Sequence, residues 1–425
     1  MFYIFLQRAL MHFCILLFSI FFSVFFSLAI AQDTQETITV NKAISLTLSS
    51  NPQLHQYIVK KEGLQGQRAS SDLSPELNLG LEFENFGGSN DFSGIDATET
   101  TVALSSVIEL GSKRSMRVSV VDARLNLLEY EQQAFTLDVL ADVVILFLKT
   151  LEIQEIKKVM LEAHELAKKT LVIVKNRSDL GATPESEVKR ATASVAQIQL
   201  QLDALQQQHE RNRIRLASFW GVTSPNWQQL EGDLFAFGRQ KDFSSLYQQA
   251  LTSPSIEIFA SDKRLKTAQL QLAQTQTKPD LSWQVGVRRF EASDDSAFIF
   301  GMSIPLFSNQ RNRGTVATVL AAQNEVELQR RSALMHLHTQ LFDAYSQRKQ
   351  HISATKILEN TIIPELRDAL QSTQHAYERG RYSYQDWIAA QKELLGAKQM
   401  LIETAAAASL NQAVIEQLIA EPLNH

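Results

Sequence analysis

The chain is built from an internal repeat. Landmark residues of the first half recur in the same order in the second, at a nearly constant spacing of about 200 residues: Pro52 and Pro254, Pro75 and Pro279, Arg114 and Arg311, Gly181 and Gly380. Each half reads as a helix, two strands, a very long helix, a turn and a returning helix. We therefore predict two tandem structural repeats, 32–235 and 236–425.

Four segments alternate between apolar and polar residues, two in each repeat. In the first of them Leu79, Leu81 and Phe83 alternate with polar residues or glycine, which predicts strands with one apolar face. The predicted strands cover about 75–86, 98–110, 279–290 and 297–307. This is the length that a tilted strand needs to cross a lipid bilayer. The alternative is an ordinary antiparallel sheet packed on helices.

The longest helices follow the strands. No proline occurs from Ser112 to Asp179, and only Pro364 occurs from 312 to 379. At 1.5 Å per residue, a helix of about 68 residues is roughly 100 Å long, which is several times the diameter of a compact domain. We predict long helices over 112–179 and 312–379, and return helices over 184–219 and 383–420. Apolar residues at helical spacing along them favour coiled-coil packing.

The first thirty-one residues differ from the rest. Arg8 is their only charged residue, and Ala29 and Ala31 follow a long apolar run. This pattern predicts a signal peptide over 1–31, with an uncleaved N-terminal anchor as the alternative. Cys14, the only cysteine, would leave with the signal peptide, so disulfides and thiolate sites are not expected. No later stretch is apolar for long enough to predict a membrane-spanning helix.

The remaining composition excludes several functions. The net charge is −5 and no basic block stands out, so nucleic acid is not an expected partner. No nucleophile–base set, phosphate-binding loop or catalytic carboxylate pair appears, so we expect neither an enzyme nor a cofactor. His336 and His338, two residues apart on a predicted helix, point in different directions, and no metal site is predicted.

Four strands are too few for a complete membrane barrel, because single-chain barrels begin at about eight strands. An open sheet edge in lipid would leave backbone groups without hydrogen-bond partners. The pattern therefore predicts that several copies assemble, although it does not choose three copies over two or four.

The motifs "IELGSKR" at 108–114 and "SIPLFSNQRNRG" at 303–314, together with the duplication, resemble those of the TolC-type outer-membrane factors. The resemblance covers nearly all of the mature chain. The "ELGSKR" form is similar to the "ELGGKR" of the heavy-metal (cobalt–zinc–cadmium) efflux branch.

The resemblance implies an α+β membrane protein in the outer membrane of a Gram-negative bacterium. It implies a homotrimer with a twelve-stranded β-barrel in outer-membrane lipid, continued by an α-helical barrel in the periplasm. The implied function is a passive exit duct that docks to a periplasmic adaptor and an inner-membrane RND-type pump and exports divalent heavy-metal cations. Drug efflux, type I protein secretion and a periplasmic coiled-coil scaffold remain alternatives.

The resemblance also implies roles for residues at the turns farthest from the strands. The acid six positions after Gly380, which is Asp386, would belong to a constricting gate, with Glu187 as its counterpart and Tyr377 in the same network. Three copies of Asp386 around a narrow pore would repel one another and raise their proton affinity. In the alternative interpretation, Ser383 and Asp386 form a capping box and Thr183-Pro184 starts a helix.

The same network has an arginine in the family, but Tyr382 stands at its position here, so Arg379 or Arg381 could substitute for it. A second acid of the family's gate is replaced by Ala389. The residues expected to contact the adaptor lie in the two turns: Leu180, Gly181, Arg379 and Gly380. The hinges between strand and long helix are predicted at four residues: Gly111, Arg114, Ser308 and Arg311.

Overall fold

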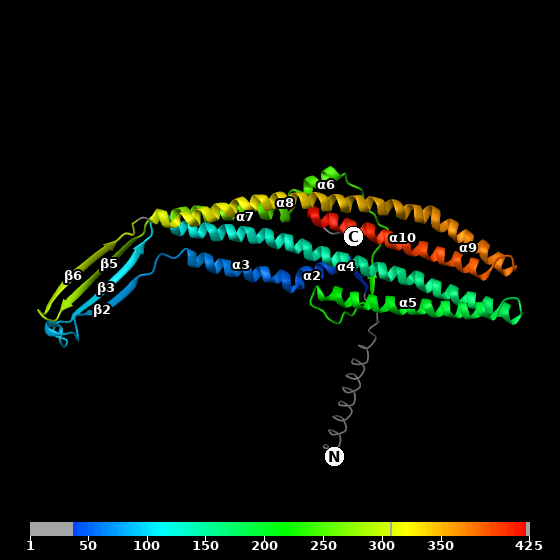
Figure 1. Cartoon of the computed structure of the whole chain (residues 1–425), viewed down its shortest axis with the longest axis horizontal. Coiled ribbons are helices and arrows are strands. Elements are labelled where there is room, and N and C mark those ends of the chain that lie inside the picture. The colour runs from blue at the N-terminus through cyan, green and yellow to red at the C-terminus, as the bar shows by residue number, and fades with distance from the viewer. Residues whose placement is uncertain (1–36, 307, 422–425) are drawn as a thin grey trace, which may run out of the picture.

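The computed structural model is elongated, with a β-sheet at one end and two helix tips at the other (Figure 1). It describes residues 37–306 and 308–421. The predicted signal peptide, 1–31, lies outside the described residues.

The long helices and strands follow one another along the chain in the order that the duplication predicts, with a few short elements added. In chain order they are β1 (Thr37–Thr39), α2 (Val40–Ser50), α3 (Pro52–Ser71), β2 (Asn78–Glu84), a 3-10 turn (Asn90–Phe92), β3 (Glu99–Ile108), α4 (Lys113–Asp179), α5 (Glu185–Ser218), β4 (Gln229–Glu231), α6 (Phe243–Ala250), α7 (Pro254–Thr275), β5 (Leu281–Phe290), β6 (Asp295–Ser303), α8 (Ser308–Ile357), a π-helical segment (Leu358–Ile362), α9 (Ile363–Glu378) and α10 (Tyr384–Ile419).

The four long strands form one antiparallel sheet in the order β2-β3-β5-β6. Each repeat contributes a hairpin, and the β3–β5 ladder joins the two repeats. This ladder aligns Val102 with Val287. In the two adjacent ladders, Leu81 pairs with Val102 and Phe298 pairs with Val287, so all four side chains lie on the same face of the sheet. Leu81 is 61% exposed and Phe298 is 89% exposed, so the apolar face of the sheet is uncovered in the single chain.

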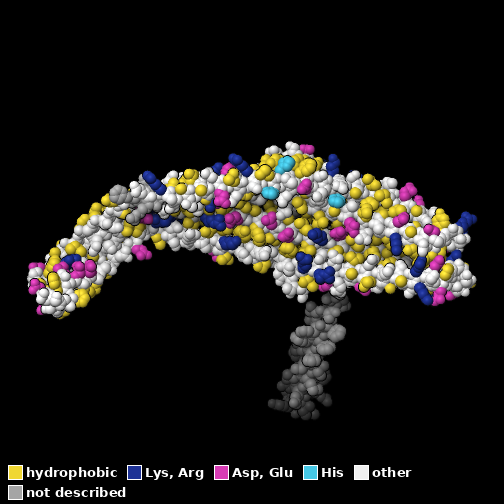
Figure 2. Space-filling view, in the orientation of Figure 1, with side chains coloured by type: hydrophobic (Ala, Val, Ile, Leu, Met, Phe, Trp, Pro, Cys, Tyr) yellow, Lys and Arg dark blue, Asp and Glu magenta, His cyan; other side chains and the backbone are white. Residues whose placement is uncertain are grey.

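The opposite face of the sheet is polar. Arg288 on β5 forms ion pairs with Glu84 on β2 and Glu99 on β3, at 2.9 and 2.8 Å. Figure 2 shows further acidic side chains gathered at the loop end of the sheet. The predicted strand over 297–307 is corrected to Asp295–Ser303, because Pro305 has no N–H to donate to a ladder.

The two long helices differ in continuity. Helix α4 runs for 67 residues without a break. The segment predicted as a long helix over 312–379 is helical from Ser308 to Glu378, but a π-helical segment, Leu358–Ile362, separates α8 from α9. The cause is Pro364, which lacks an N–H and whose ring crowds the carbonyl of Asn360 four residues earlier.

The largest apolar core lies halfway along the molecule. There Phe147 and Leu151 of α4 pack with Leu216 of α5, Trp227 and Ala405 of α10. The short strands β1 and β4 pair in parallel beside this core. They hold the start of the first repeat against the segment that links the two repeats. None of the helices in the described part of the chain combines the length and the apolar character needed to cross a membrane.

Candidate gate at the helix tips

The two tips, where α4 turns into α5 and α9 turns into α10, are closed in the same way. Gly181 and Gly380 have φ angles of +72° and +74°. The N–H after each glycine bonds back to the helix, from Ala182 to the Arg177 carbonyl and from Arg381 to the Ala376 carbonyl, both at 2.8 Å. This closure needs the left-handed conformation that glycine adopts without strain. Both turns therefore depend on their glycine.

A buried tyrosine joins the two tips. Tyr377 of α9 is 3% exposed, and its hydroxyl donates a hydrogen bond of 3.1 Å to Oε2 of Glu187 on α5. Burial, and then the adjacent Glu187 carboxylate, raise the pKa of Tyr377 to about 12. The phenol therefore stays protonated and remains a donor across the physiological range. Two of the predicted gate residues, from different repeats, are thus brought into contact.

Arg177 completes this contact, and the sequence analysis did not single it out. Its guanidinium lies 4.8 Å from the centre of the Tyr377 ring, and its Nη1 donates a hydrogen bond of 2.8 Å to the carbonyl of Glu378. Cation–π and charge-assisted contacts of this kind favour arginine. The arginine next to Tyr377 thus comes from the first repeat, whereas the sequence suggested Arg379 or Arg381. The sequence feature that could have indicated Arg177 is its place in the last turn of a long helix, where a cation is favourable.

Aromatic packing fixes the position of Tyr377. The ring of Trp387 stacks on it with 5.0 Å between centroids, and Tyr384 approaches it edge-on. Trp387 is 1% exposed and lies in a cluster with Val174 and Ala191. The tips are therefore held together by a small apolar core and by the polar contacts that Tyr377 and Arg177 make across it.

Asp386 lies at the start of α10 and forms the capping box that the alternative interpretation predicted. The Ser383 hydroxyl and N–H donate to Asp386 Oδ2 at 2.6 and 3.0 Å, and the Asp386 N–H donates to the Ser383 hydroxyl at 3.2 Å. These bonds from Ser383 lower the pKa of Asp386. The predicted rise in the proton affinity of Asp386 depends on the repulsion between neighbouring copies. Within one chain, the bonds from Ser383 change the pKa of Asp386 in the opposite direction, downward.

The start of α5 differs from the expected cap. The helix begins at Glu185 with Pro184 in the cap position, and no side chain caps it. The hydroxyl of Thr183 is buried without a hydrogen-bond partner. Thr183-Pro184 is therefore not the N-cap and first-turn pair of the alternative interpretation. The outermost turn residues are accessible: Leu180 is 84% exposed, and Arg379 and Gly380 are also exposed.

At the other end of the long helices, the predicted hinge connects the two repeats. Gly111 has a φ angle of +83°, and a side chain there would collide with Lys278. The next helix begins with Lys113, whose ammonium group donates to the Lys278 carbonyl at 2.8 Å and to Asp280 at 2.7 Å. Arg114 pairs with Asp72 at 2.9 Å.

The second hinge is described only in part. Ser308 is the first residue of α8, and the side chains of Ser308 and Arg311 lie outside the described part of the structure. Across residues 37–306 and 308–421, no three His, Cys, Asp or Glu side chains gather in a way that could hold a metal ion.

This arrangement of a four-stranded β-sheet and two very long helical hairpins has known counterparts. A family model described as "Outer membrane efflux protein" matches residues 43–222 and 246–421. The chain belongs to the outer membrane efflux protein family, as its motifs predicted. It is a transport duct of the Gram-negative outer membrane, with a large periplasmic helical part, and not an enzyme.

Individual relatives are distant but cover most of the chain. The cobalt-zinc-cadmium resistance protein CzcC of Cupriavidus metallidurans is 22% identical over 85% of this chain and 85% of its own length. The pyoverdine export outer membrane protein OpmQ of Pseudomonas putida is 25% identical over 78% of this chain and 74% of its own length. The solved structure of CusC, a protein that forms a transmembrane channel, matches with a TM-score of 0.78 at 16% identity. That match covers 90% of this chain and 92% of CusC.

Proposed function

We propose that this chain is the outer-membrane duct of a tripartite efflux system that exports divalent heavy-metal cations. In this proposal three copies form a twelve-stranded barrel, and their helices continue it as a tunnel toward a periplasmic adaptor and an inner-membrane pump.

The observation that carries the proposal is the uncovered apolar face of the sheet. Leu79, Leu81, Phe298 and Phe300 are all more than half exposed, and the outer edges of β2 and β6 pair with no strand among the described residues. Water is a poor solvent for such a surface, and an open edge in lipid leaves backbone groups unsatisfied. Lipid against the apolar face would keep that face out of water, and a further copy at each edge would supply hydrogen-bond partners for the backbone groups of β2 and β6.

The metal substrate is supported by the relatives and by the motif. CzcC is a cobalt-zinc-cadmium resistance protein, and a second relative, NccC, is a nickel-cobalt-cadmium resistance protein. The "ELGSKR" motif agrees with that branch of the family. The polar face of the sheet carries more acids than bases around Arg288, which suits the passage of cations.

We place the gate at the tips. Asp386 and Glu187 would form acidic rings in the assembly, and Tyr377 with Arg177 would hold the α9–α10 tip against the α4–α5 tip. The exposed turns at Leu180-Gly181 and Arg379-Gly380 are the proposed contacts with the adaptor. The glycine-closed turns support this role, because they present a fixed backbone at the far end of the molecule.

The function is tested with a strain that lacks the gene. Deletion should raise sensitivity to cobalt, zinc, cadmium and nickel salts, and the intact gene should restore resistance. Unchanged sensitivity to all four metals would overturn the metal assignment. Because OpmQ exports pyoverdine, the same strain is also scored for sensitivity to drugs and for release of siderophore and secreted proteins. A defect in one of these alone would identify the corresponding alternative.

A further inference from the structure

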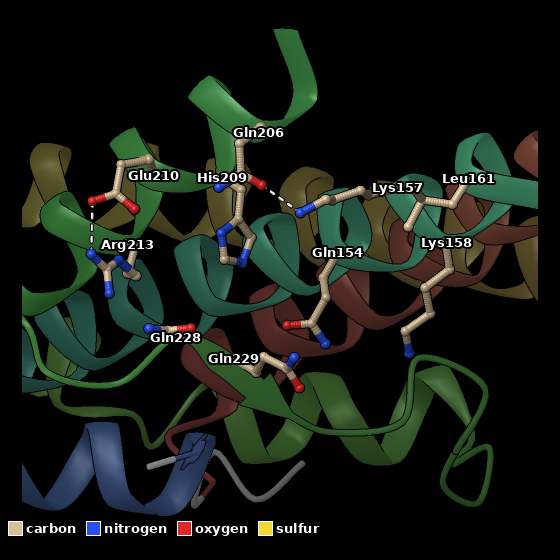
Figure 3. A pocket seen from close by; sticks show the side chains of 10 residues that line it. All are labelled: Gln154, Lys157, Lys158, Leu161, Gln206, His209, Glu210, Arg213, Gln228 and Gln229. Carbon is tan, nitrogen blue, oxygen red and sulfur yellow. Dashed lines mark hydrogen bonds and ion pairs between the residues drawn. The ribbon is translucent and has the colours of Figure 1, made fainter. Parts of the chain in front are cut away.

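A cavity of about 440 Å³ lies halfway along the molecule, between α4, α5 and the segment that leads into β4 (Figure 3). Four glutamines, two lysines, an arginine, a histidine, a glutamate and one leucine line it. All of these belong to the predicted first repeat, 32–235, and two of them, Gln228 and Gln229, lie in the linker segment at its end. The cavity is therefore complete within one copy of the chain, and it is far from the tips.

His209 of α5 is the unusual residue of this cavity. It is only 8% exposed, and its Nε2 has no hydrogen-bond partner. Burial, and then the charges of Lys157 and Arg213, lower its pKa, so the imidazole is neutral near pH 7. A neutral imidazole can present an N–H at Nε2. A buried polar atom without a partner is unfavourable, and a ligand with an acceptor group would satisfy it.

One wall of the cavity is fixed by its own hydrogen bonds. Arg213 donates to the carbonyl of Trp227 at 2.5 Å and pairs with Glu210 at 2.7 Å. Gln154 donates to the Leu230 carbonyl at 3.0 Å and accepts from the Leu230 N–H at 2.9 Å. These groups are engaged in holding the linker against α4 and α5. The cavity is consequently formed before any ligand arrives.

The other wall offers positive charge. Lys157 and Lys158 of α4 both line the cavity and reach it through long, flexible stems. Lys157 donates to the side-chain oxygen of Gln206, and Lys158 pairs with Glu155 at 2.7 Å while remaining 63% exposed. Of the three lining cations, Arg213 is paired with Glu210, and Lys158 is paired with Glu155, which does not line the cavity. Lys157 contacts only the neutral amide of Gln206, so its charge is left as a net excess of one positive charge. This excess of positive charge disfavours a metal cation and favours an anion.

We propose that this cavity binds a small organic carboxylate. Lys157 and Lys158 would contact the carboxylate, and His209 Nε2 would donate a hydrogen bond to it. The side chain of Gln229, which also lines the cavity, would supply a donor and an acceptor to the rest of the molecule. A single inorganic ion would fill only part of the volume, whereas a ligand of several carbon atoms would occupy it.

Calorimetric titration of the purified full-length protein in detergent tests this proposal. The probe is glutarate, with inorganic phosphate and chloride as parallel titrations at constant ionic strength. Glutarate should bind saturably and more tightly than phosphate, and chloride should show no saturable binding. Lys157→Gln and His209→Gln should each weaken glutarate binding about tenfold or more, the loss of a charge-assisted hydrogen bond.

The matched control is Lys168→Gln. Lys168 lies on the same helix in an ion pair with Glu165, outside the cavity, and this variant should bind glutarate as the wild type does. Because Lys157 is on the surface, its replacement should leave the oligomer intact, which size-exclusion chromatography verifies. The proposal is overturned if glutarate does not bind saturably or if Lys157→Gln binds like the control. Phosphate binding as tight as glutarate binding would also overturn it, since the ligand would then be any oxyanion.

Discussion

Asp386 has two proposed roles, and replacing it with alanine would remove both at once. Its carboxylate caps α10 through Ser383, and in the proposed assembly its charge narrows the pore. Asp386→Asn keeps an acceptor for the cap and removes the charge, whereas Ser383→Ala keeps the charge and weakens the cap.

We predict that Asp386→Asn raises single-channel conductance in planar bilayers and lowers the preference for cations. Ser383→Ala should lower the melting temperature but leave the cation preference unchanged. Equal changes in conductance in the two variants would reduce Asp386 to a helix cap.

Tyr377 should titrate unusually late. Its pKa in the folded protein is about 12, above the value of about 10 expected for an unfolded chain. The stability that it contributes is therefore fully present below pH 10 and is lost as the pH rises through 12. In the tyrosinate absorbance titration, the difference between wild type and Tyr377→Phe should have its midpoint near 12.

Glu187→Gln provides the control for this prediction, because it removes the carboxylate charge beside Tyr377. In Glu187→Gln the midpoint should move down, though not to the unfolded value, since burial remains the larger cause. A midpoint near 10 in the wild type would show that the tips do not hold Tyr377 in this contact.

At the scale of elements, the strands and long helices could be predicted because their signals are local. The alternation of Leu79, Leu81 and Phe83 is visible within one strand, and the absence of proline over 112–179 is visible within one helix. The pairing of β1 with β4 could not be predicted, because each strand has three residues and Ile38 aligns with Leu230 across almost half the chain. Arg177 was missed for the same reason, since its partner Tyr377 lies in the other repeat.

The β3–β5 ladder contains a position where only glycine fits. A Cβ on Gly286 would lie 2.4 Å from the carbonyl oxygen of Val102. Gly286→Val should therefore destabilise the sheet by about 1–3 kcal/mol through overpacking, although valine forms strands better than glycine does. Gly301→Val is the control, because its nearest neighbour is 4.0 Å away. The oligomer is followed in gels after heating, and the temperature at which its band disappears should be lower for Gly286→Val and unchanged for Gly301→Val. The same temperature for the two variants would contradict this account.

The turn between α4 and α5 can be tested without disturbing the fold. Leu180 is 84% exposed, so Leu180→Asp removes no packing inside the chain. We predict that it impairs efflux while the oligomer remains intact, measured as metal sensitivity together with crosslinking to the adaptor. Leu200→Asp, at a 70% exposed site within α5, should leave efflux unchanged. Normal efflux and crosslinking in Leu180→Asp would place the adaptor contact elsewhere.

For the whole molecule, the proposed assembly predicts a membrane-bound trimer. The protein should resist carbonate extraction from outer membranes. In detergent it should have three times the mass of one mature chain by light scattering, and heating should dissociate it. A monodisperse single chain that is soluble without detergent and retains its sheet would contradict the proposal, because Phe298 and its apolar neighbours would then face water.

The seam between the two repeats has a consequence for how copies recognise one another. Within the chain, β3 of one hairpin docks antiparallel on β5 of the next, and the strands at the two ends of the sheet, β2 and β6, run in opposite directions. A neighbour's β2 can therefore meet β6 with the same polarity that β5 presents to β3. In the proposed assembly, β6 and a neighbour's β2 would repeat, at each boundary between copies, the antiparallel junction that β3 and β5 form between the two repeats of one chain.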